Sequence, residues 1–212
     1  IKFDISPPDD TAARTAIFRA RTGVRPLLLG ASTRDGEEAL LLDAFARLAP
    51  AEVLLVLVPR HPQRVDEVAK LAATRDLKLQ RRSDNSAVDA DTRVWLGDSM
   101  GEMSVYYALD DVALIGGSWL AFGGQNPIEA CASGTPVIVG PHTFNFAAVA
   151  EQAILAGAAV RAPDVEDGVR TGLNLLEDAA SRDAMARAGK AFAEADRGAS
   201  ARTLEMLEAL KP

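Results

Sequence analysis

Short runs of apolar residues alternate along this chain with longer segments in which apolar residues recur at helical spacing. The short runs lack the polar and apolar alternation of a half-exposed sheet, so they predict strands that are buried on both faces. These strands are expected at residues 26–32, 53–58, 93–97, 112–115, 136–140 and 158–161, with a weaker strand at residues 77–80.

The longer segments place their apolar residues on one helical face, as Leu41, Ala44, Phe45 and Leu48 illustrate. Helices are expected at residues 11–21, 37–48, 62–73, 100–109, 126–133, 145–156, 165–177, 182–195 and 199–210. Strands that alternate with helices predict an α/β fold, a three-layer Rossmann-like parallel sheet with helices on both faces.

The chain divides into three predicted parts. Residues 1–25 are expected to form an interdomain linker and a leading helix capped by Asp10 or Thr11, residues 26–195 the Rossmann-like domain, and residues 196–212 a C-terminal helix. The first residue is Ile1 rather than methionine, and no signal peptide follows it. We therefore expect the chain to begin inside a longer protein.

Composition narrows the classes of function. Of the 212 residues 48% are apolar, enough for a real core, and the formal net charge of −7 argues against nucleic acid as a partner. The lone Cys131 excludes an internal disulfide and is expected to be a buried apolar group. No apolar run reaches the length of a membrane-spanning helix, so the chain itself is expected to be soluble.

Parallel sheets bind ligands beyond the carboxyl ends of their strands, which directs attention to the loops at residues 32–36, 59–63, 97–102 and 116–126. These loops contain no P-loop, no G-x-G-x-x-G after the first strand, no zinc-ligand spacing and no G-x-S-x-G elbow. No cofactor or metal and no catalytic set is therefore predicted, and the loops are interpreted as binding loops.

The glycine-rich loop before the helix at residues 126–133 has the chemistry of a nucleotide site. Pro127 suits a first helical turn, Asn126 can cap it, and the free amides there can hold an anion. Glu129 can accept two hydroxyl donors such as a ribose diol, although a role in complementing the helix dipole fits it equally.

Two other loops face the same rim. Asp98 or Ser99 can cap the predicted helix at residues 100–109, where Glu102 either binds a ligand or only complements the dipole. Arg60 lies between two prolines that stiffen its loop, and its guanidinium suits a phosphate, although a solvated surface arginine is the alternative.

Taken in order, the motifs resemble the carboxyl-terminal, donor-binding half of 3-deoxy-D-manno-octulosonic acid (Kdo) transferases. The resemblance covers nearly the whole chain, with Gln125 where the family often has histidine and Ser99 where it often has threonine. The matching stretches are Lys2-Phe3-Asp4, Gly30-Ala31-Ser32-Thr33 with Gly36-Glu37-Glu38, Pro59-Arg60-His61-Pro62 with Arg64, Gly97 to Met103, Gly116-Gly117-Ser118 with Gly123 to Glu129, and Gly140 to Phe146.

The resemblance implies one half of a GT-B glycosyltransferase, an inverting enzyme that transfers Kdo from CMP-Kdo to a lipid A precursor in lipopolysaccharide synthesis. It implies CMP contacts, with Glu129 on the ribose hydroxyls and Arg60 on the leaving phosphate, from the following residues: Pro59, Arg60, Met100, Gly101, Glu102, Asn126, Pro127, Ile128 and Glu129. Support for the donor site is expected from Ser32, Ser118, Gly123, Gly124 and Gln125.

The same resemblance places the general base, the acceptor surface and the membrane anchor in an amino-terminal half. The whole protein is then expected at the cytoplasmic face of the bacterial inner membrane, and this chain alone is expected to bind nucleotide without transferring sugar. Two alternatives remain open: another GT-B sugar-nucleotide enzyme, such as half of a UDP-sugar transferase or epimerase, and a non-catalytic α/β domain that binds a small ligand.

Overall fold

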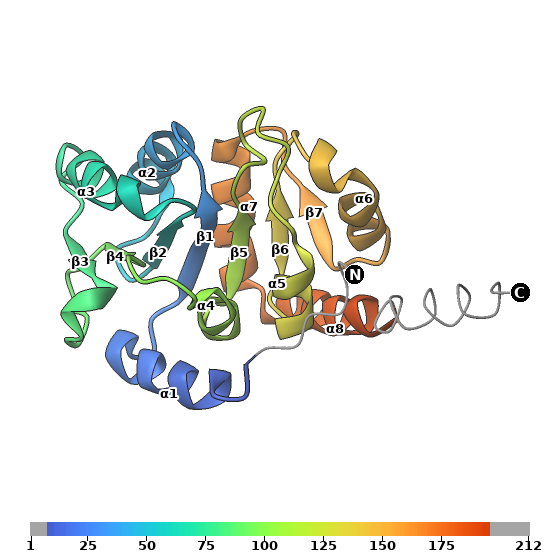
Figure 1. Ribbon diagram of the computed structural model, residues 1–212, viewed down its shortest axis with the longest axis horizontal. Helices are drawn as coiled ribbons and strands as arrows, with labels where there is room; N and C mark the ends of the chain where they lie inside the picture. The colour runs from blue at the N-terminus through green and yellow to red at the C-terminus, as the bar shows by residue number, and fades with distance from the viewer. Residues whose placement is uncertain (1–7, 196–212) are drawn as a thin grey trace, which may run out of the picture.

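The computed structural model describes residues 8–195, and in this range seven parallel strands form one sheet in the order β3-β4-β2-β1-β5-β6-β7 (Figure 1). All of the predicted strands are confirmed, and most of their ends are shifted by one or two residues. The strands are β1 (Leu27–Thr33), β2 (Leu54–Pro59), β3 (Leu79–Arg81), β4 (Val94–Leu96), β5 (Val112–Ile115), β6 (Val137–Val139) and β7 (Ala159–Arg161).

The helices follow the predicted alternation. The helix expected at residues 199–210 lies outside the described residues. Those described are α1 (Thr11–Thr22), α2 (Glu37–Leu48), α3 (Val65–Ala73), α4 (Met103–Leu109), α5 (Ile128–Ser133), α6 (Ala147–Leu155), α7 (Val165–Glu177) and α8 (Ala179–Ala195), with short 3-10 turns η1 (Pro62–Arg64), η2 (Arg82–Asp84) and η3 (Phe144–Phe146).

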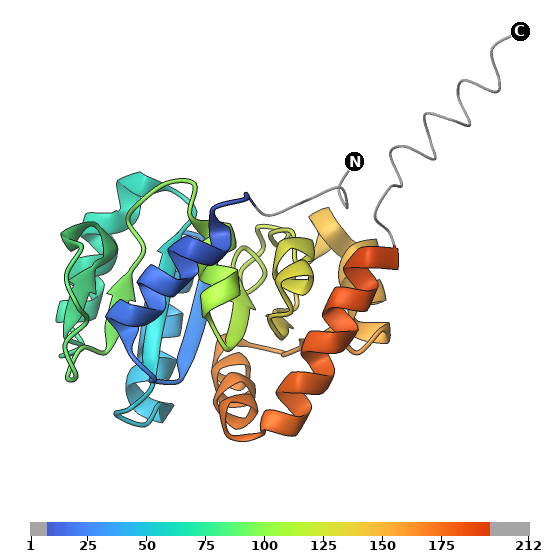
Figure 2. The same cartoon turned by 90° about the horizontal axis from the view of Figure 1, so that it is seen from below.

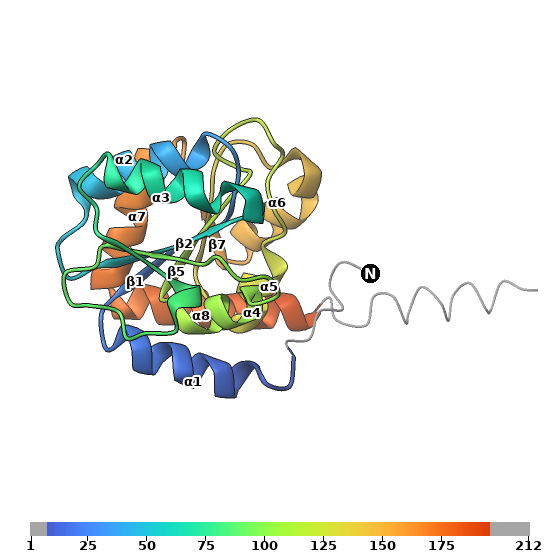
Figure 3. The same cartoon turned by 60° about the vertical axis from the view of Figure 1, so that its left-hand side comes forward.

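The sheet is covered on both faces, with α2, α3 and α7 on one side and α1, α4, α5 and α8 on the other (Figure 3). Successive side chains of β1 alternate between these layers: Leu27 and Leu29 join one buried cluster and Leu28 the other. Both faces are apolar, which is why the strand sequences show no polar alternation. The prediction of a three-layer Rossmann-like fold is confirmed.

Helix α1 packs on the same domain, beside α4 (Figure 2). Its Phe18 is buried, with its ring centroid 5.2 Å from that of Trp95 and 5.5 Å from that of Tyr106. Asp10 occupies the N-cap position of α1 but makes no side-chain cap bond. The domain boundary at residue 25 stays a prediction.

Two helix starts that matter for the site were predicted wrongly. Helix α4 begins at Met103 rather than at residue 100, because Gly101 has a φ of +73° and turns the chain. Asp98 does not cap it, since its carboxylate accepts hydrogen bonds from the backbone N–H and the hydroxyl of Ser83. Helix α5 begins at Ile128 rather than at residue 126.

Other helix ends differ by a few residues. The helices expected from residues 62 and 145 are preceded by the 3-10 turns η1 and η3, and α8 begins three residues earlier than expected. Across residues 8–195 no helix combines the length and the apolar character needed to cross a bilayer.

Candidate functional site

The strand order reverses at β1. The chain builds β2, β4 and β3 on one side of β1, and β5, β6 and β7 on the other. In such sheets the crevice at the reversal point is where ligands bind. The carboxyl ends of β1 and β5 lie in close contact here. A Cβ added at Gly116 would lie only 2.4 Å from the carbonyl oxygen of Ser32.

A pocket of about 390 Å³ opens at this edge, a size typical of small-molecule sites. Ser32 near the end of β1 and the loops after β2, β4 and β5 contribute to it, so the carboxyl ends of four strands meet there as the sequence predicted. Its lining residues are Ser32, Val58, Pro59, Arg60, Ser99, Met100, Gly101, Glu102, Met103, Tyr107, Gln125, Asn126 and Glu129.

Arg60 is exposed at the mouth of this pocket. Its backbone N–H donates to the carbonyl of Thr33 over 2.9 Å, which fixes the start of the loop next to the end of β1. The other end of the loop is held by Arg64, whose guanidinium donates to the fully buried Glu38 over 3.2 and 3.3 Å. The Arg60 side chain is therefore presented from an anchored loop.

Glu129 is half-buried near the start of α5, and burial raises the pKa of its carboxyl. Tyr107 also lines the pocket and is 3% exposed. The pKa of Tyr107 is raised by its burial and, secondarily, by the negative charge of Glu129. A carboxylate with little competition from solvent is a strong acceptor for ligand hydroxyls.

Asn126 uses its side chain locally. Its Oδ1 accepts the backbone N–H of Ile128 over 3.1 Å, while Pro127 itself stands at the N-cap position. One of the amides that could have faced an anion is thus already bonded, and proline brings none. Within this loop Gln125, Asn126 and Glu129 reach the pocket, whereas Pro127 and Ile128 do not line it.

Glu102 is 4% exposed, and its carboxylate is held by two arginines from elsewhere in the chain. Arg82 donates to both of its oxygens, and Arg14 donates to one of them. Its acceptor capacity is largely committed to these cations. Neither interpretation of Glu102 from the sequence, as a ligand-binding residue or as a dipole-complementing one, anticipated this ion cluster.

Three of the predicted supporting residues lie outside the pocket lining: Ser118, Gly123 and Gly124. The Ser118 hydroxyl is buried, donates to the carbonyl of Ile115 and accepts the N–H of Gly140 over 2.8 Å. Gly123 has a φ of +90°, and its carbonyl accepts the N–H of Asn145 over 3.0 Å. These residues therefore fix the conformation of the loop and do not form the surface of the pocket.

Ser32 does line the pocket, and its backbone is unusual. It has a φ of +54°, a left-handed conformation that costs a residue with a side chain about 1 kcal/mol or more. Its hydroxyl contacts the sulfur of Met103 at 3.7 Å. Strain of this kind at a pocket edge is typical of functional sites.

Four lining residues were not assigned to the site from the sequence: Val58, Ser99, Met103 and Tyr107. Met103 and Tyr107 are four residues apart, on one face of α4. Helical spacing from the loop at residues 99–102 was the signal that could have found them.

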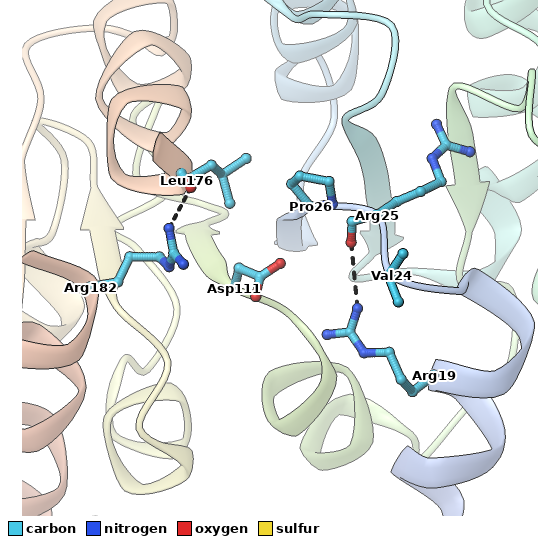
Figure 4. Close-up of a pocket in the computed structure, with 7 residues that line it drawn as sticks. All are labelled: Arg19, Val24, Arg25, Pro26, Asp111, Leu176 and Arg182. Atoms are coloured by element: carbon cyan, nitrogen blue, oxygen red, sulfur yellow. Dashed lines mark hydrogen bonds between the residues drawn. The ribbon is translucent and has the colours of Figure 1, made fainter. Parts of the chain in front are cut away.

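A second pocket, of about 350 Å³, lies at the opposite, amino ends of the strands, between α1 and α8 (Figure 4). Its arginines are already used by backbone carbonyls. Arg19 donates to Leu109 over 2.6 Å, and Arg182 donates to Leu175 over 2.8 Å. The Arg25 side chain points away from Asp111 in the figure and donates to the carbonyl of Glu52 over 3.0 Å. The arginines of this pocket therefore connect neighbouring elements of the fold.

Comparison with known proteins shows which family the chain belongs to. Residues 38–192 match the family model described as glycosyl transferases group 1. The chain is 47% identical over 98% of its length to the 3-deoxy-D-manno-octulosonic acid transferase of Bordetella pertussis and 34% identical over 98% to that of Haemophilus influenzae, and it covers 50% of each. It thus spans about half the length of these curated relatives.

A solved structure of similar extent also matches. The C-terminal CMP-Kdo binding domain of WaaA from Acinetobacter baumannii superposes with a TM-score of 0.81 at 30% identity, over 86% of this chain and 97% of that domain. The predicted resemblance is confirmed. The chain therefore belongs to the group 1 glycosyl transferases and, within them, to the 3-deoxy-D-manno-octulosonic acid transferases.

Proposed function

We propose that this chain is the donor-binding part of an inverting glycosyltransferase that moves Kdo from CMP-Kdo to a lipid A precursor in lipopolysaccharide synthesis. The observation that carries the proposal is the pocket at the β1–β5 reversal, which gathers residues from four strand ends. The likeness to a CMP-Kdo binding domain over nearly all of that domain's length supports the choice of donor.

Different lining residues contact different parts of the donor. Glu129 accepts the ribose hydroxyls, because its half-buried carboxylate faces the pocket beside Tyr107. Arg60 holds the phosphate, since it lines the same pocket and its guanidinium is free to reach a ligand there. Pro59, Met100 and Gly101 supply the walls around the base, and Gln125 and Asn126 supply amide groups. Glu102 acts mainly through the loop that it anchors.

Arg60 also has a part in the chemistry that we propose. When the bond between the sugar and the phosphate breaks, the electron pair stays on the phosphate oxygen of the departing CMP. A positive guanidinium beside that phosphate stabilises the developing charge. With α5 short and its first free amide bonded to Asn126, this stabilisation rests on Arg60 more than on helix ends.

The rest of the reaction belongs to the whole protein. We propose that the general base and the lipid acceptor surface lie in its amino-terminal half and that it works at the cytoplasmic face of the inner membrane. The chain alone is then expected to bind CMP and CMP-Kdo without transferring Kdo. Transfer to a lipid acceptor by the purified chain would contradict this division.

Calorimetric titration tests the donor assignment directly. Wild type is titrated with CMP and with UDP, and the CMP titration is repeated with Glu129→Ala and Arg60→Ala. We expect saturable binding of CMP, weaker binding of UDP, and at least a tenfold loss of CMP affinity in each variant, which corresponds to about 1.4 kcal/mol.

Matched controls come from the surface far from the pocket. Glu177→Ala removes an exposed carboxylate at the end of α7, and Arg170→Ala removes an exposed guanidinium on the same helix. Both are expected to bind CMP as wild type does. A preference for UDP would favour a UDP-sugar enzyme, and selective binding of an unrelated small ligand would favour a non-catalytic domain.

A further inference from the structure

The carboxylate of Glu37 lies inside the protein and is saturated by backbone donors. Glu37 is the first residue of α2 and is 0% exposed. Its Oε2 accepts the N–H groups of Arg34 over 2.8 Å and Gly117 over 2.7 Å. Its Oε1 accepts those of Trp119 over 2.9 Å and Leu120 over 3.3 Å.

These four donors come from the two loops that border the crevice. Arg34 belongs to the loop after β1, two residues beyond the strained Ser32 near the end of that strand, while the other three donors belong to the glycine loop after β5. Glu37 N–H donates back to the carbonyl of Arg34 over 3.0 Å, which closes the turn. One buried carboxylate thus joins the loop after β1 to the loop after β5.

The glycine loop relays this anchoring to the pocket. Gly117, held at its N–H by Glu37, accepts the N–H of Gly124 at its carbonyl over 2.7 Å. The adjacent Gly116 carbonyl accepts the N–H of Gln125 over 3.0 Å. Gln125 and Asn126 then line the pocket. Glu37 itself does not line it.

We propose that Glu37 is a positioning residue of the donor site, which fixes the loop after β5 so that Gln125 and Asn126 meet the donor in one conformation. The inference rests on the proposed function, since it assumes that this pocket takes the nucleotide. Because such a loop is already ordered in the free protein, donor binding does not have to supply the free energy of ordering it.

The substitution Glu37→Gln tests this with almost no change of shape. Each carboxylate oxygen accepts two N–H groups, so either orientation of the amide turns an NH₂ group toward two backbone donors. At least two of the four hydrogen bonds are lost whichever way the amide lies. Glu37→Asp is the second variant; it keeps the charge but is one methylene shorter, and it serves if the first does not fold.

Asp111→Asn is the matched control. Asp111 also uses a carboxylate oxygen to accept a backbone N–H, that of Leu27 over 2.8 Å, but at the other edge of the sheet. Amide hydrogen exchange is measured by NMR in wild type and the variants, and CMP affinity by calorimetry. The exchange measurement reads the loop itself and needs no ligand.

In Glu37→Gln we expect the amides of Gly117 and Trp119 to exchange at least tenfold faster while those of the buried strand β2 are unchanged. CMP affinity is expected to fall at least tenfold. Asp111→Asn keeps an oxygen that can accept the Leu27 N–H, and it is expected to leave exchange in the glycine loop unchanged and to bind CMP as wild type does.

Unchanged exchange in the glycine loop, or faster exchange there with wild-type CMP affinity, would overturn the inference and leave the proposed function standing. If wild type bound no CMP, the proposed function would fail and this inference would fall with it. A loss of CMP affinity in Asp111→Asn equal to that in Glu37→Gln would also overturn it, because general destabilisation would then explain both.

Discussion

Arg82 donates two hydrogen bonds to the Glu102 carboxylate, from Nε to Oε2 over 3.0 Å and from Nη2 to Oε1 over 2.7 Å. Arg14 of α1 donates to the same carboxylate, and the guanidinium carbon of Arg82 lies 4.8 Å from the ring centroid of Phe18. Through these contacts α1 and η2 hold the loop that carries Met100 and Gly101 into the pocket.

The first prediction is that Glu102→Gln destabilises the fold more than it weakens the donor site. Neutralising the buried carboxylate leaves Arg14 and Arg82 without their shared anion, and breaking a buried pair in this way costs about 3 kcal/mol. Urea unfolding measures this loss. CMP affinity is expected to fall less than in Glu129→Ala. A variant of wild-type stability that no longer binds CMP would instead make Glu102 a direct ligand of the nucleotide.

Glu102 illustrates which features of the structure the sequence could and could not predict. Most strands were predictable because they are local apolar runs, although β3 with its sequence Leu79-Gln80-Arg81 is not, and the pocket loops followed from the topology of parallel sheets. The partners of Glu102 are 20 and 88 residues away in the chain, and no local pattern reveals them. The same holds for Glu37, whose donors in the glycine loop are at least 80 residues distant.

The start of α4 was mispredicted for a local reason. Asp98 and Ser99 are good caps by residue type, but Gly101 adopts a left-handed φ and the chain turns once more before the helix begins. The sequence shows that a glycine is present, not which conformation it takes. The predicted loop residues therefore include many that line the pocket, whereas the predicted helix starts at these loops were wrong.

The second prediction compares two glycines of the site. In Gly116→Ala the new Cβ meets the backbone of Ser32 at 2.4 Å, so β1 and β5 must move apart, and we expect a loss of stability above about 2 kcal/mol. In Gly101→Ala nothing lies within 4 Å, and only the φ of +73° is unfavourable, which costs about 1 kcal/mol. Denaturant melts of the two variants check the order; equal losses would contradict it.

The third prediction concerns Asp110, which is 7% exposed. Neither carboxyl oxygen has a hydrogen-bond partner among residues 8–195. Burial raises the pKa of this carboxyl well above its ordinary value, with a smaller contribution from the charge of Asp111. The folded state therefore keeps the proton at a pH where the unfolded state has lost it.

The sign of the effect follows from this difference. Stability contributed by Asp110 is fully present below the ordinary aspartate pKa and is lost as the pH rises from there through the raised folded pKa. Asp110→Asn removes the titration, so we expect it to be more stable than wild type at pH 7 by at least about 1 kcal/mol, with the gap closing toward pH 4. Unfolding free energies measured across this range decide it; a gap that does not vary with pH would refute the assignment.

The fourth prediction uses the titration of Glu129 to test its contact with ribose. Burial raises the pKa of this carboxyl, so it takes up a proton at a higher pH than an exposed glutamate does. A protonated carboxyl is a poorer acceptor for two ribose hydroxyls, so CMP affinity should weaken as the pH falls through that raised pKa. The nucleotide itself titrates in the same range, and for that reason Glu129→Gln is measured beside wild type at each pH. The ratio of the two affinities cancels the titration of the ligand. We expect this ratio to be at least about tenfold at pH 8 and to approach one toward pH 4, whereas a ratio that stays constant would mean that the charge of Glu129 has no part in holding the ribose.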